Sequence, residues 1–160
     1  MLALKTAFIV YERTNKPFTS NSTVHATLVL DPNSTLHDAS QHFDKWLDEV
    51  CKLVGTGRYG VSYFGARFTL NSVGSQWPHI HIVIRTVKSR KTGLTISRLD
   101  CKDKDRLCAY WESLAGRPAR GKACILETVF HMPKLIGYMA GVKNADRPMQ
   151  QMHLITSSGY

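Results

Sequence analysis

The sequence predicts an α+β domain with a central, largely antiparallel sheet of about five strands flanked by helices. Three features predict this class. Short runs rich in β-branched and aromatic residues recur along the chain, as is typical of strands. Longer segments show the periodicity of amphipathic helices. The chain has 160 residues, with neither an internal repeat nor a linker, so we expect residues 1–160 to form a single domain.

The first part of the chain is predicted to form two strands followed by a long helix. The strands are expected at 5–12 and 23–30, joined by a loop rich in Thr, Asn, Pro and Ser. A turn at 31–34 then offers an N-cap for a helix. Apolar residues follow at helical spacing, so this helix is expected to run to about Gly55.

The rest of the chain is predicted to alternate strands with shorter helices. The expected strands are 61–70, 79–87, 94–99, 123–130 and 153–156. The expected helices are 103–115 and 133–142, and Pro133 suits a first helical position because the N–H there has no intrahelical partner. A basic turn at 88–93 and a Gly/Arg-rich loop at 116–122 are the main connections.

The charge of the chain indicates a polyanionic partner. Lys and Arg number 21 against 12 acidic residues, which gives a net charge of +9. No acidic residue lies between Glu49 and Asp100, although this stretch is rich in Lys and Arg. We therefore expect a nucleic acid to bind near the middle of the chain.

Other features of the composition bear on the compartment. No apolar run reaches the roughly 20 residues that span a bilayer, and the N-terminus lacks the cleavage site of a signal peptide. We therefore expect a cytoplasmic protein with no membrane partner. The four cysteines form no Cys-x-x-Cys pair, which favours free thiols over a zinc knuckle or disulfides.

The sequence His79-Ile80-His81 is the strongest chemical signal. Residues two apart on a strand point to the same face, so both imidazoles are expected to project together while Ile82 and Ile84 join Ile80 on the core side. Two neighbouring imidazoles can share one divalent cation. The pair is therefore a candidate metal site.

Tyr138 is the candidate nucleophile. It lies on the predicted helix 133–142, downstream of the histidine strand. A tyrosine hydroxyl can attack a phosphodiester when a metal ion polarises the phosphate and stabilises charge on the leaving oxygen. A tyrosine packed on an amphipathic helix is the alternative interpretation, and the order of the two elements favours the nucleophile.

These segments resemble those of one family. Segment 77–84, WPHIHIVI, resembles the HUH motif of rolling-circle replication initiators, in which two histidines flank one hydrophobic residue. Segment 27–30, TLVL, is similar to a strand that precedes this motif in the family, and segment 135–140, LIGYMA, is similar to the helix that carries the nucleophilic tyrosine. Segment 152–160, MHLITSSGY, resembles the short strand and turn that often follow that helix in phage and plasmid initiators.

The resemblance implies an HUH-superfamily endonuclease of the single-tyrosine type with an RRM-like fold, since Val142 stands where a second tyrosine would fall. It implies that His79 and His81 hold Mg²⁺ or Mn²⁺ against the scissile phosphate of single-stranded origin DNA. Tyr138 would attack this phosphate, leaving a phosphotyrosine link to the 5′ end and a free 3′-OH that primes synthesis. A host or separate helicase and polymerase would act with it, in the cytoplasm of the host cell of a phage, virus or plasmid.

The family's lysine, three or four residues after the tyrosine, is absent from its expected place. Gly141 and Val142 occupy those positions, and the nearest lysine, Lys143, lies on a different side of an ideal helix. Lys134, one turn before Tyr138, is the competing candidate. Both lysines therefore stay open as the residue that assists the tyrosine.

The third metal ligand is also open. Many relatives supply a Glu from the strand before the histidines, but 61–70 contains none. The candidate donors are Gln76 and Glu127, ahead of Asn71, Asp31 and His25.

The expected DNA contacts come from basic side chains and one aromatic ring. The candidates for the phosphates are Arg85, Lys88, Arg90, Lys91, Arg117, Arg120 and Lys122. Trp77, with Tyr63 as a second possibility, is expected to stack on unpaired bases. The alternative functions are an HUH transposase or relaxase with the same chemistry, and a non-catalytic nucleic-acid-binding protein whose histidine pair is structural.

Overall fold

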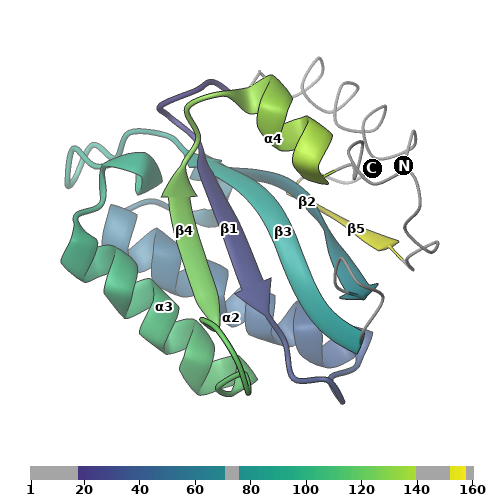
Figure 1. Ribbon diagram of the computed structural model, residues 1–160. Helices are drawn as coiled ribbons and strands as arrows, with labels where there is room; N and C mark the ends of the chain where they lie inside the picture. The colour runs from purple at the N-terminus through teal and green to yellow at the C-terminus, as the bar shows by residue number, and fades with distance from the viewer. Residues whose placement is uncertain (1–17, 71–75, 140–151, 158–160) are drawn as a thin grey trace.

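The computed structural model describes residues 18–70, 76–139 and 152–157, which form a sheet with helices on both faces (Figure 1). The strands are β1 (Val24–Val29), β2 (Val61–Leu70), β3 (Gln76–Thr86), β4 (Cys124–Thr128) and β5 (Met152–Thr156). They lie in the order β4-β1-β3-β2-β5, and all four pairings are antiparallel. The predicted α+β class with a central antiparallel sheet is confirmed.

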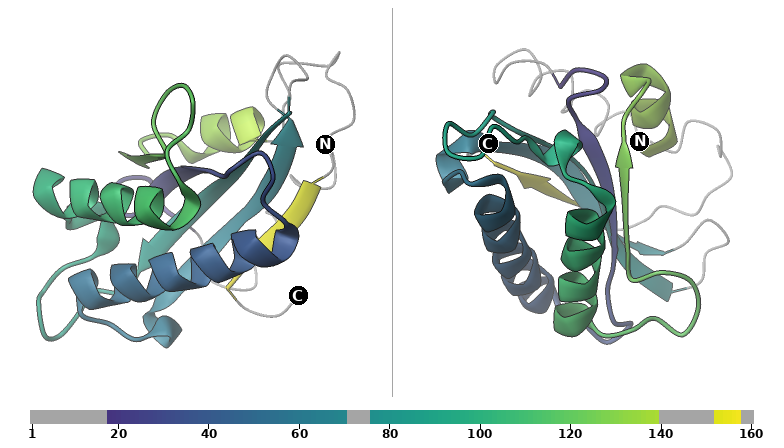
Figure 2. Two further views of the ribbon diagram at one scale, coloured as in Figure 1. Left: turned by 90° about the horizontal axis from the view of Figure 1, so that it is seen from below. Right: turned by 90° about the vertical axis from the view of Figure 1, so that its left-hand side faces the viewer.

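The helices divide the fold into layers. Helices α2 (Leu36–Val54) and α3 (Cys101–Ala115) cover one face of the sheet, and α4 (Met132–Met139) lies on the other (Figure 2). The main core lies under α2 and α3, where Ile80, Ile82 and Ile84 of β3 are fully buried. A second, smaller core on the opposite face joins Met132 of α4 to Val83 of β3.

Local signals in the sequence fix the ends of the two long helices. Thr35 is the N-cap of α2 and forms a capping box with Asp38, so two backbone N–H groups at the helix start are paired. Gly55 ends the helix at φ 80°, a left-handed conformation in which glycine has no steric penalty. Asp100 caps α3 by accepting from the N–H of Asp103.

Two buried tryptophans connect the helical layer. The indole Nε1 of Trp46 on α2 donates to the carbonyl of Leu107 on α3 at 3.1 Å. The indole Nε1 of Trp111 on α3 donates to the carbonyl of Val29 at the end of β1 at 2.8 Å. The two rings meet edge to face at 6.4 Å. The helical layer is thereby attached to the end of β1 that approaches the histidine strand.

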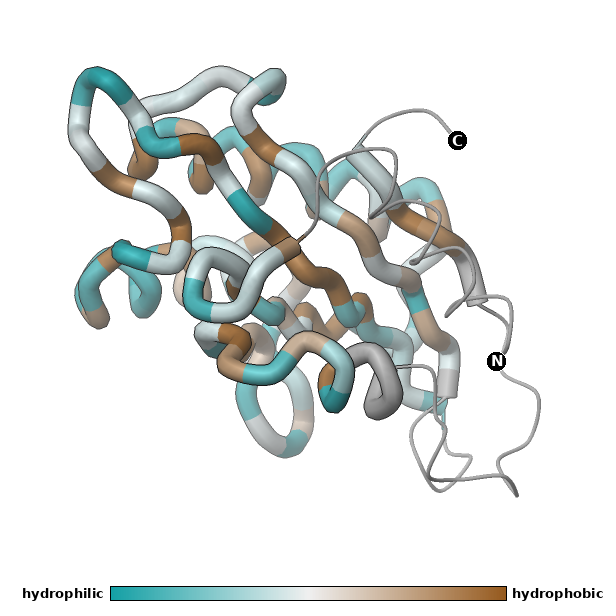
Figure 3. Tube along the Cα trace, turned by 90° about the horizontal axis from the view of Figure 1, so that it is seen from above, coloured by the Kyte–Doolittle hydropathy of each residue, from teal (hydrophilic) through white to brown (hydrophobic). Residues whose placement is uncertain are grey.

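The hydropathy of the residues follows the layers of the fold. Figure 3 shows hydrophobic residues recurring along the strands and hydrophilic residues gathering in the connecting loops. Among the helices that the structure describes, none is both long and apolar enough to cross a membrane.

All four cysteines are free, as predicted, and the Sγ atoms of Cys108 and Cys124 are 3.1 Å apart between α3 and β4.

The structure corrects one predicted strand. Residues 94–99 contain a short 3₁₀ helix, Ile96–Arg98, in place of a strand. The apolar Ile96 and Leu99 are both buried, and their spacing of three matches a 3₁₀ turn, since residues three apart on a strand point to opposite faces. The backbone N–H of Ile96 donates to the hydroxyl of Thr86, so the segment is held by a side chain and not by a ladder.

The other differences concern boundaries. β3 begins three residues before the predicted strand and includes Pro78. A proline has no N–H to pair, and Pro78 lies beside the register shift between Phe68 and Leu70 of β2, where the ladder is irregular. The carbonyl of Pro78 accepts a hydrogen bond from the N–H of Leu30. The predicted strand at 5–12 and the end of the predicted helix, 140–142, lie outside the described residues.

Gly65 is where β2 approaches β3 most closely. A Cβ atom at this position would lie 2.0 Å from the carbonyl oxygen of His81 and 2.6 Å from the Cα of Ile82. Both atoms belong to the backbone, so no side-chain rotation can relieve the overlap. The contact requires glycine on the strand that neighbours the histidines.

We expect Gly65→Ala to lower the free energy of unfolding by about 3 kcal/mol, since the ladder beside His81 must separate to admit the methyl group. Urea denaturation followed by circular dichroism measures the change. Gly93→Ala is the control, because nothing lies within 4 Å of a Cβ there and its positive φ costs about 1–2 kcal/mol. Equal stability losses in both variants would contradict the close approach.

Candidate functional site

Three histidines gather on the face of the sheet opposite α2 and α3. His79 and His81 lie on β3 and are half-buried, whereas the alternate isoleucines of this strand face the main core. His25 lies on β1 and is buried. The β1–β3 register pairs Thr27 with His81, so His25 and Thr27 lie along the same face beside the histidine pair. The predicted common orientation of His79 and His81 is therefore present.

The hydrogen bonding of His79 fixes which ring nitrogen carries its proton. Nδ1 of His79 lies 2.6 Å from the carbonyl oxygen of Trp77. A carbonyl only accepts, so Nδ1–H is the donor and the lone pair of the neutral ring lies on Nε2. A backbone hydrogen bond of this kind is the usual way in which a metal-binding histidine is oriented.

His81 meets the two polar side chains of β1 through one nitrogen. Its Nδ1 lies 3.1 Å from Nε2 of His25 and 3.2 Å from Oγ1 of Thr27. Burial lowers the pKa of His25 to about 4, so this imidazole is neutral at pH 7 and can accept a hydrogen bond. When Nδ1–H of His81 donates to His25, the lone pair of His81 is on Nε2, as in His79.

Aromatic contacts hold the two rings of the pair in place. His79 and His81 are perpendicular, with ring centroids 4.8 Å apart. Phe68 of β2 stacks on His79 at 5.5 Å and meets His81 edge-on at 5.7 Å. His81 also stacks on His25 at 5.2 Å. The pair is thus enclosed by neighbouring strands on both sides, and each ring has little freedom to rotate.

Helix α4 packs on the same face as the histidines. Met132 is buried and Leu135 is half-buried against Phe64, Ala66 and Val83, whose strands carry or flank the histidine pair. Tyr138 belongs to α4, three residues after Leu135. The element with the candidate nucleophile therefore covers part of the face with the candidate metal ligands.

The structure separates the candidates for a third ligand. Gln76 lies an odd number of residues from His79 on β3, and its amide donates to the carbonyl of Pro32 away from the pair. Glu127 pairs with His25 across β1 and β4, so it lies on the histidine face but one strand farther from His81. Asn71 falls outside the described residues.

Asp31 lies in the turn after β1, where its Oδ1 accepts from the N–H of Asn33. His25 is the candidate that reaches the pair, and it does so at Nδ1 of His81. Within the described part of the chain, no group of three His, Cys, Asp or Glu side chains is arranged to hold a metal ion.

The candidate assisting lysines are only partly described. Lys134 is exposed on α4, one turn before Tyr138. Its backbone N–H donates to Nδ1 of His131 at 3.1 Å, at the start of the helix. Lys143 lies outside the described residues.

The basic residues divide between the two ends of the sheet (Figure 1). The turn with Lys88, Arg90 and Lys91 follows the end of β3, where Ser89 donates to the carbonyl of Gly55. The loop with Arg117, Arg120 and Lys122 lies at the opposite end, beside the start of β3. His79 is about 23 Å along the strand from Thr86, at ~3.3 Å per residue. Only the second loop is close to the histidines.

Arg85 is half-buried on β3, on the histidine face. The two aromatic candidates lie on different sides of the sheet. Tyr63 packs edge to face on Phe43 of α2 at 5.2 Å, within the helical layer. Trp77 is half-buried two residues before His79 and lines a pocket with Arg117. Trp77 alone of this pair adjoins the histidines.

Thr27 and Phe68 are site residues that the sequence analysis did not single out. Both contact the histidine pair from neighbouring strands. Their alternation with core residues indicates which face of the strand they occupy, but only the β1–β3 and β2–β3 registers place them beside the histidines.

Compared with protein-family models, with curated proteins and with solved structures, the chain has no match.

We expect the protein to bind Mn²⁺ in the absence of DNA, and His79→Ala or His81→Ala to weaken this binding about tenfold or more, because each removes a ligand. His25→Ala should weaken it by a similar factor through loss of the hydrogen bond that orients His81. Electron paramagnetic resonance of free Mn²⁺ measures the affinity.

His37→Ala is the matched control for this experiment, since His37 is exposed on α2 and belongs to another face. If His37→Ala lowers the affinity as much as His81→Ala does, Mn²⁺ binds elsewhere.

Proposed function

We propose that this protein is a metal-dependent endonuclease that nicks and rejoins single-stranded DNA through a tyrosine, as in the initiation of rolling-circle replication. The observation that carries the proposal is the oriented pair His79 and His81 on the same face of the sheet as α4, the helix with Tyr138. Half-buried imidazoles with Nε2 lone pairs suit a cation, and a tyrosine on a helix that packs on the same face of the sheet suits attack on a phosphodiester.

The donor set favours one class of cation. Imidazole nitrogens bind first-row transition metals, whereas Mg²⁺ prefers oxygen ligands and keeps several waters. His79 and His81 would hold the ion, and substrate phosphate oxygens and water complete its coordination. We therefore expect Mn²⁺ to support activity better than Mg²⁺. When bound, the ion polarises the phosphate and stabilises charge on the leaving oxygen.

The reaction of Tyr138 is a transesterification. Its oxygen forms a bond to phosphorus while the bond from phosphorus to the 3′ oxygen breaks. The phenol loses its proton, and the leaving oxygen takes up a proton to become a free 3′-OH. The 5′ phosphate stays linked to the tyrosine, so the same 3′-OH or another can attack it and reseal the strand. A separate polymerase would extend this 3′-OH, and a separate helicase would supply the single strand.

The substrate follows from charge and shape. The net charge of +9 favours a polyanion. The pair lies half-buried on the central strand of the sheet, with Trp77 and the loop of Arg117 at one side. A single strand can present an unpaired base and its phosphate to such a surface, whereas the stacked bases of a duplex cannot reach it.

Two alternatives follow from particular observations. The net charge of +9 would also suit a non-catalytic nucleic-acid-binding protein, since it attracts a polyanion without any metal. The third histidine, His25, raises the alternative of a relaxase or transposase, in which more than two histidines would bind the metal. His25 meets His81 at Nδ1, however, so it orients that ring and does not converge on Nε2.

We expect the wild-type protein to form a denaturation-resistant adduct with single-stranded DNA and Mn²⁺, visible as a shifted band in a denaturing gel and prevented by EDTA. Tyr138→Phe should abolish the adduct, because it removes the nucleophilic oxygen. Tyr59→Phe is the matched control, since Tyr59 is 94% exposed away from the histidines. An adduct with Tyr138→Phe, or none with wild type on a random pool of sequences, contradicts the proposal.

We also expect the two basic loops to differ. Replacing Arg117, Arg120 and Lys122 with Ala should reduce the slope of log K against log[salt] by about 2 for a short oligonucleotide, at ~0.7 per phosphate contact. The matched triple replacement of Lys88, Arg90 and Lys91 should leave that slope near the wild-type value, since this loop lies at the far end of the sheet. Fluorescence anisotropy at several salt concentrations makes the comparison, and the reverse order would move the DNA to the other end.

A further inference from the structure

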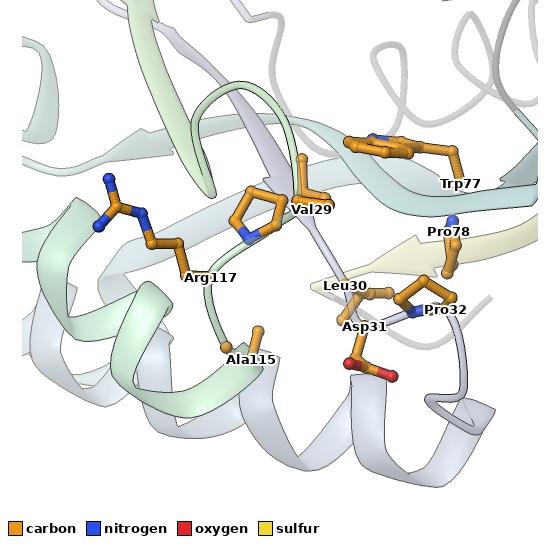
Figure 4. Close-up of a pocket in the computed structure, with 11 residues that line it drawn as sticks. Val29, Leu30, Asp31, Pro32, Trp77, Pro78, Ala115 and Arg117 are labelled. Atoms are coloured by element: carbon orange, nitrogen blue, oxygen red, sulfur yellow. The ribbon is translucent and has the colours of Figure 1, made fainter.

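We propose that a pocket at the start of β3 binds one unstacked nucleobase of single-stranded DNA, and that it favours bases with an exocyclic amino group. The choice of ligand rests on the proposed function, and the inference adds to it the part of the protein that reads sequence. The pocket lies between the end of β1, the turn after it, the first residues of β3 and the loop that joins α3 to β4 (Figure 4).

The pocket adjoins the histidine pair directly. Trp77 lines it and is two residues from His79 on the same face of β3. The carbonyl of Trp77 accepts the hydrogen bond from Nδ1 of His79. Val29, another lining residue, is the partner of His79 in the β1–β3 register. A nucleotide with its phosphate at the histidines therefore has its own base, or that of its neighbour, within reach of the pocket.

The walls suit a flat, apolar ring. Figure 4 shows the indole of Trp77 lying across one side, with Leu30, Pro32 and Ala115 on the other. Pro118 and other proline rings add apolar surface without any N–H donor. The cavity volume is about 260 Å³, just below the ~300–1,000 Å³ of sites for drug-sized ligands. One base on an aromatic platform fits this size, and stacking of that kind holds unpaired bases.

Asp31 supplies the polar recognition from the rim of the pocket, since its carboxylate points away from the indole of Trp77 and can meet only the outer edge of a stacked base (Figure 4). Its Oδ1 accepts from the N–H of Asn33 at 2.8 Å. Among the residues that the structure describes, none donates to Oδ2. A carboxylate accepts and does not donate, so it pairs with an amino group such as N4 of cytosine and not with O4 of thymine. The pocket should therefore prefer amino-bearing bases to thymine.

Charge at the rim suits the phosphates. The guanidinium of Arg117 points outward from the pocket, away from Trp77 (Figure 4). Arg120 and Lys122 follow on the same exposed loop. Nε of Arg117 lies 4.0 Å from Oε1 of Glu112 on an exposed surface, where such a pair contributes little. A base inside the pocket and cations outside it match the two parts of a nucleotide.

Tryptophan fluorescence can report on this pocket. The chain has three tryptophans, and Trp46 and Trp111 are fully buried with their indole N–H groups bonded to the backbone. Trp77 is the one that lines the pocket. Stacking of a base should therefore quench the fluorescence of Trp77, and Trp77→Phe should remove the quenching while it keeps an aromatic platform.

The test titrates the full chain with oligo(dC) and with oligo(dT) of equal length, in EDTA so that no cleavage takes place. We expect wild type to bind oligo(dC) about tenfold more tightly. Asp31→Asn should reduce this ratio to about twofold or less, because an amide can donate to O4 of thymine. Trp77→Ala, which lacks the fluorescent reporter and is therefore followed by anisotropy of a labelled oligonucleotide, should weaken both complexes about tenfold. Phe130→Ala is the control, since Phe130 is an exposed aromatic residue outside the pocket.

The outcomes separate the two proposals. If the dC-to-dT ratio is the same in wild type and Asp31→Asn, and Trp77→Ala binds as wild type does, the pocket proposal is overturned even when the adduct with Tyr138 forms. If the ratio responds as expected but no adduct forms with Mn²⁺, the base pocket stands and the nuclease proposal fails. Quenching that persists in Trp77→Phe would also overturn the pocket proposal.

Discussion

The position of β3 at the centre of the sheet is the constraint on which the candidate site depends. Its side chains alternate, so the isoleucines at 80, 82 and 84 face α2 and α3 while His79 and His81 face the other side. Burial of each isoleucine stabilises the fold by roughly 1.5–3 kcal/mol. A shift of the strand by one residue would expose all three and bury both imidazoles. The energy of the main core therefore holds the two histidines on the second face.

Neighbouring strands then give the histidines a defined orientation. β1 contributes His25 and Thr27, which meet Nδ1 of His81, and the carbonyl of Trp77 receives Nδ1–H of His79. Burial keeps the pKa of His25 near 4, so this contact brings no positive charge to the site at neutral pH. A neutral, hydrogen-bonded surrounding is suited to a cation, because a charged imidazolium nearby would repel it. Phe68 restricts the remaining motion of the rings.

The basic side chains lie at both ends of the sheet, but only one group is close to the histidines. The basic turn after β3 is attached to the C-terminal end of α2, whereas the loop of Arg117 lies at the other end, next to Trp77 and the start of β3. A polyanion bound at the histidines is closer to the second loop. The pocket beside that loop combines apolar rings with a carboxylate, so charge attracts the strand and the pocket selects among its bases.

The sequence by itself determined most elements and the common orientation of His79 and His81, because strand alternation and helix capping are properties of adjacent residues. It did not determine that 94–99 forms a 3₁₀ helix, since the hydroxyl that holds Ile96 belongs to Thr86 on another element. The contact of His25 with His81 joins residues 56 apart in the chain. The opposite orientation of Gln76, the distance of Glu127 and the pocket at Trp77 likewise depend on register and loop packing. Only the tertiary structure decides these, because a strand pattern specifies which face a residue occupies but not which strand lies beside it.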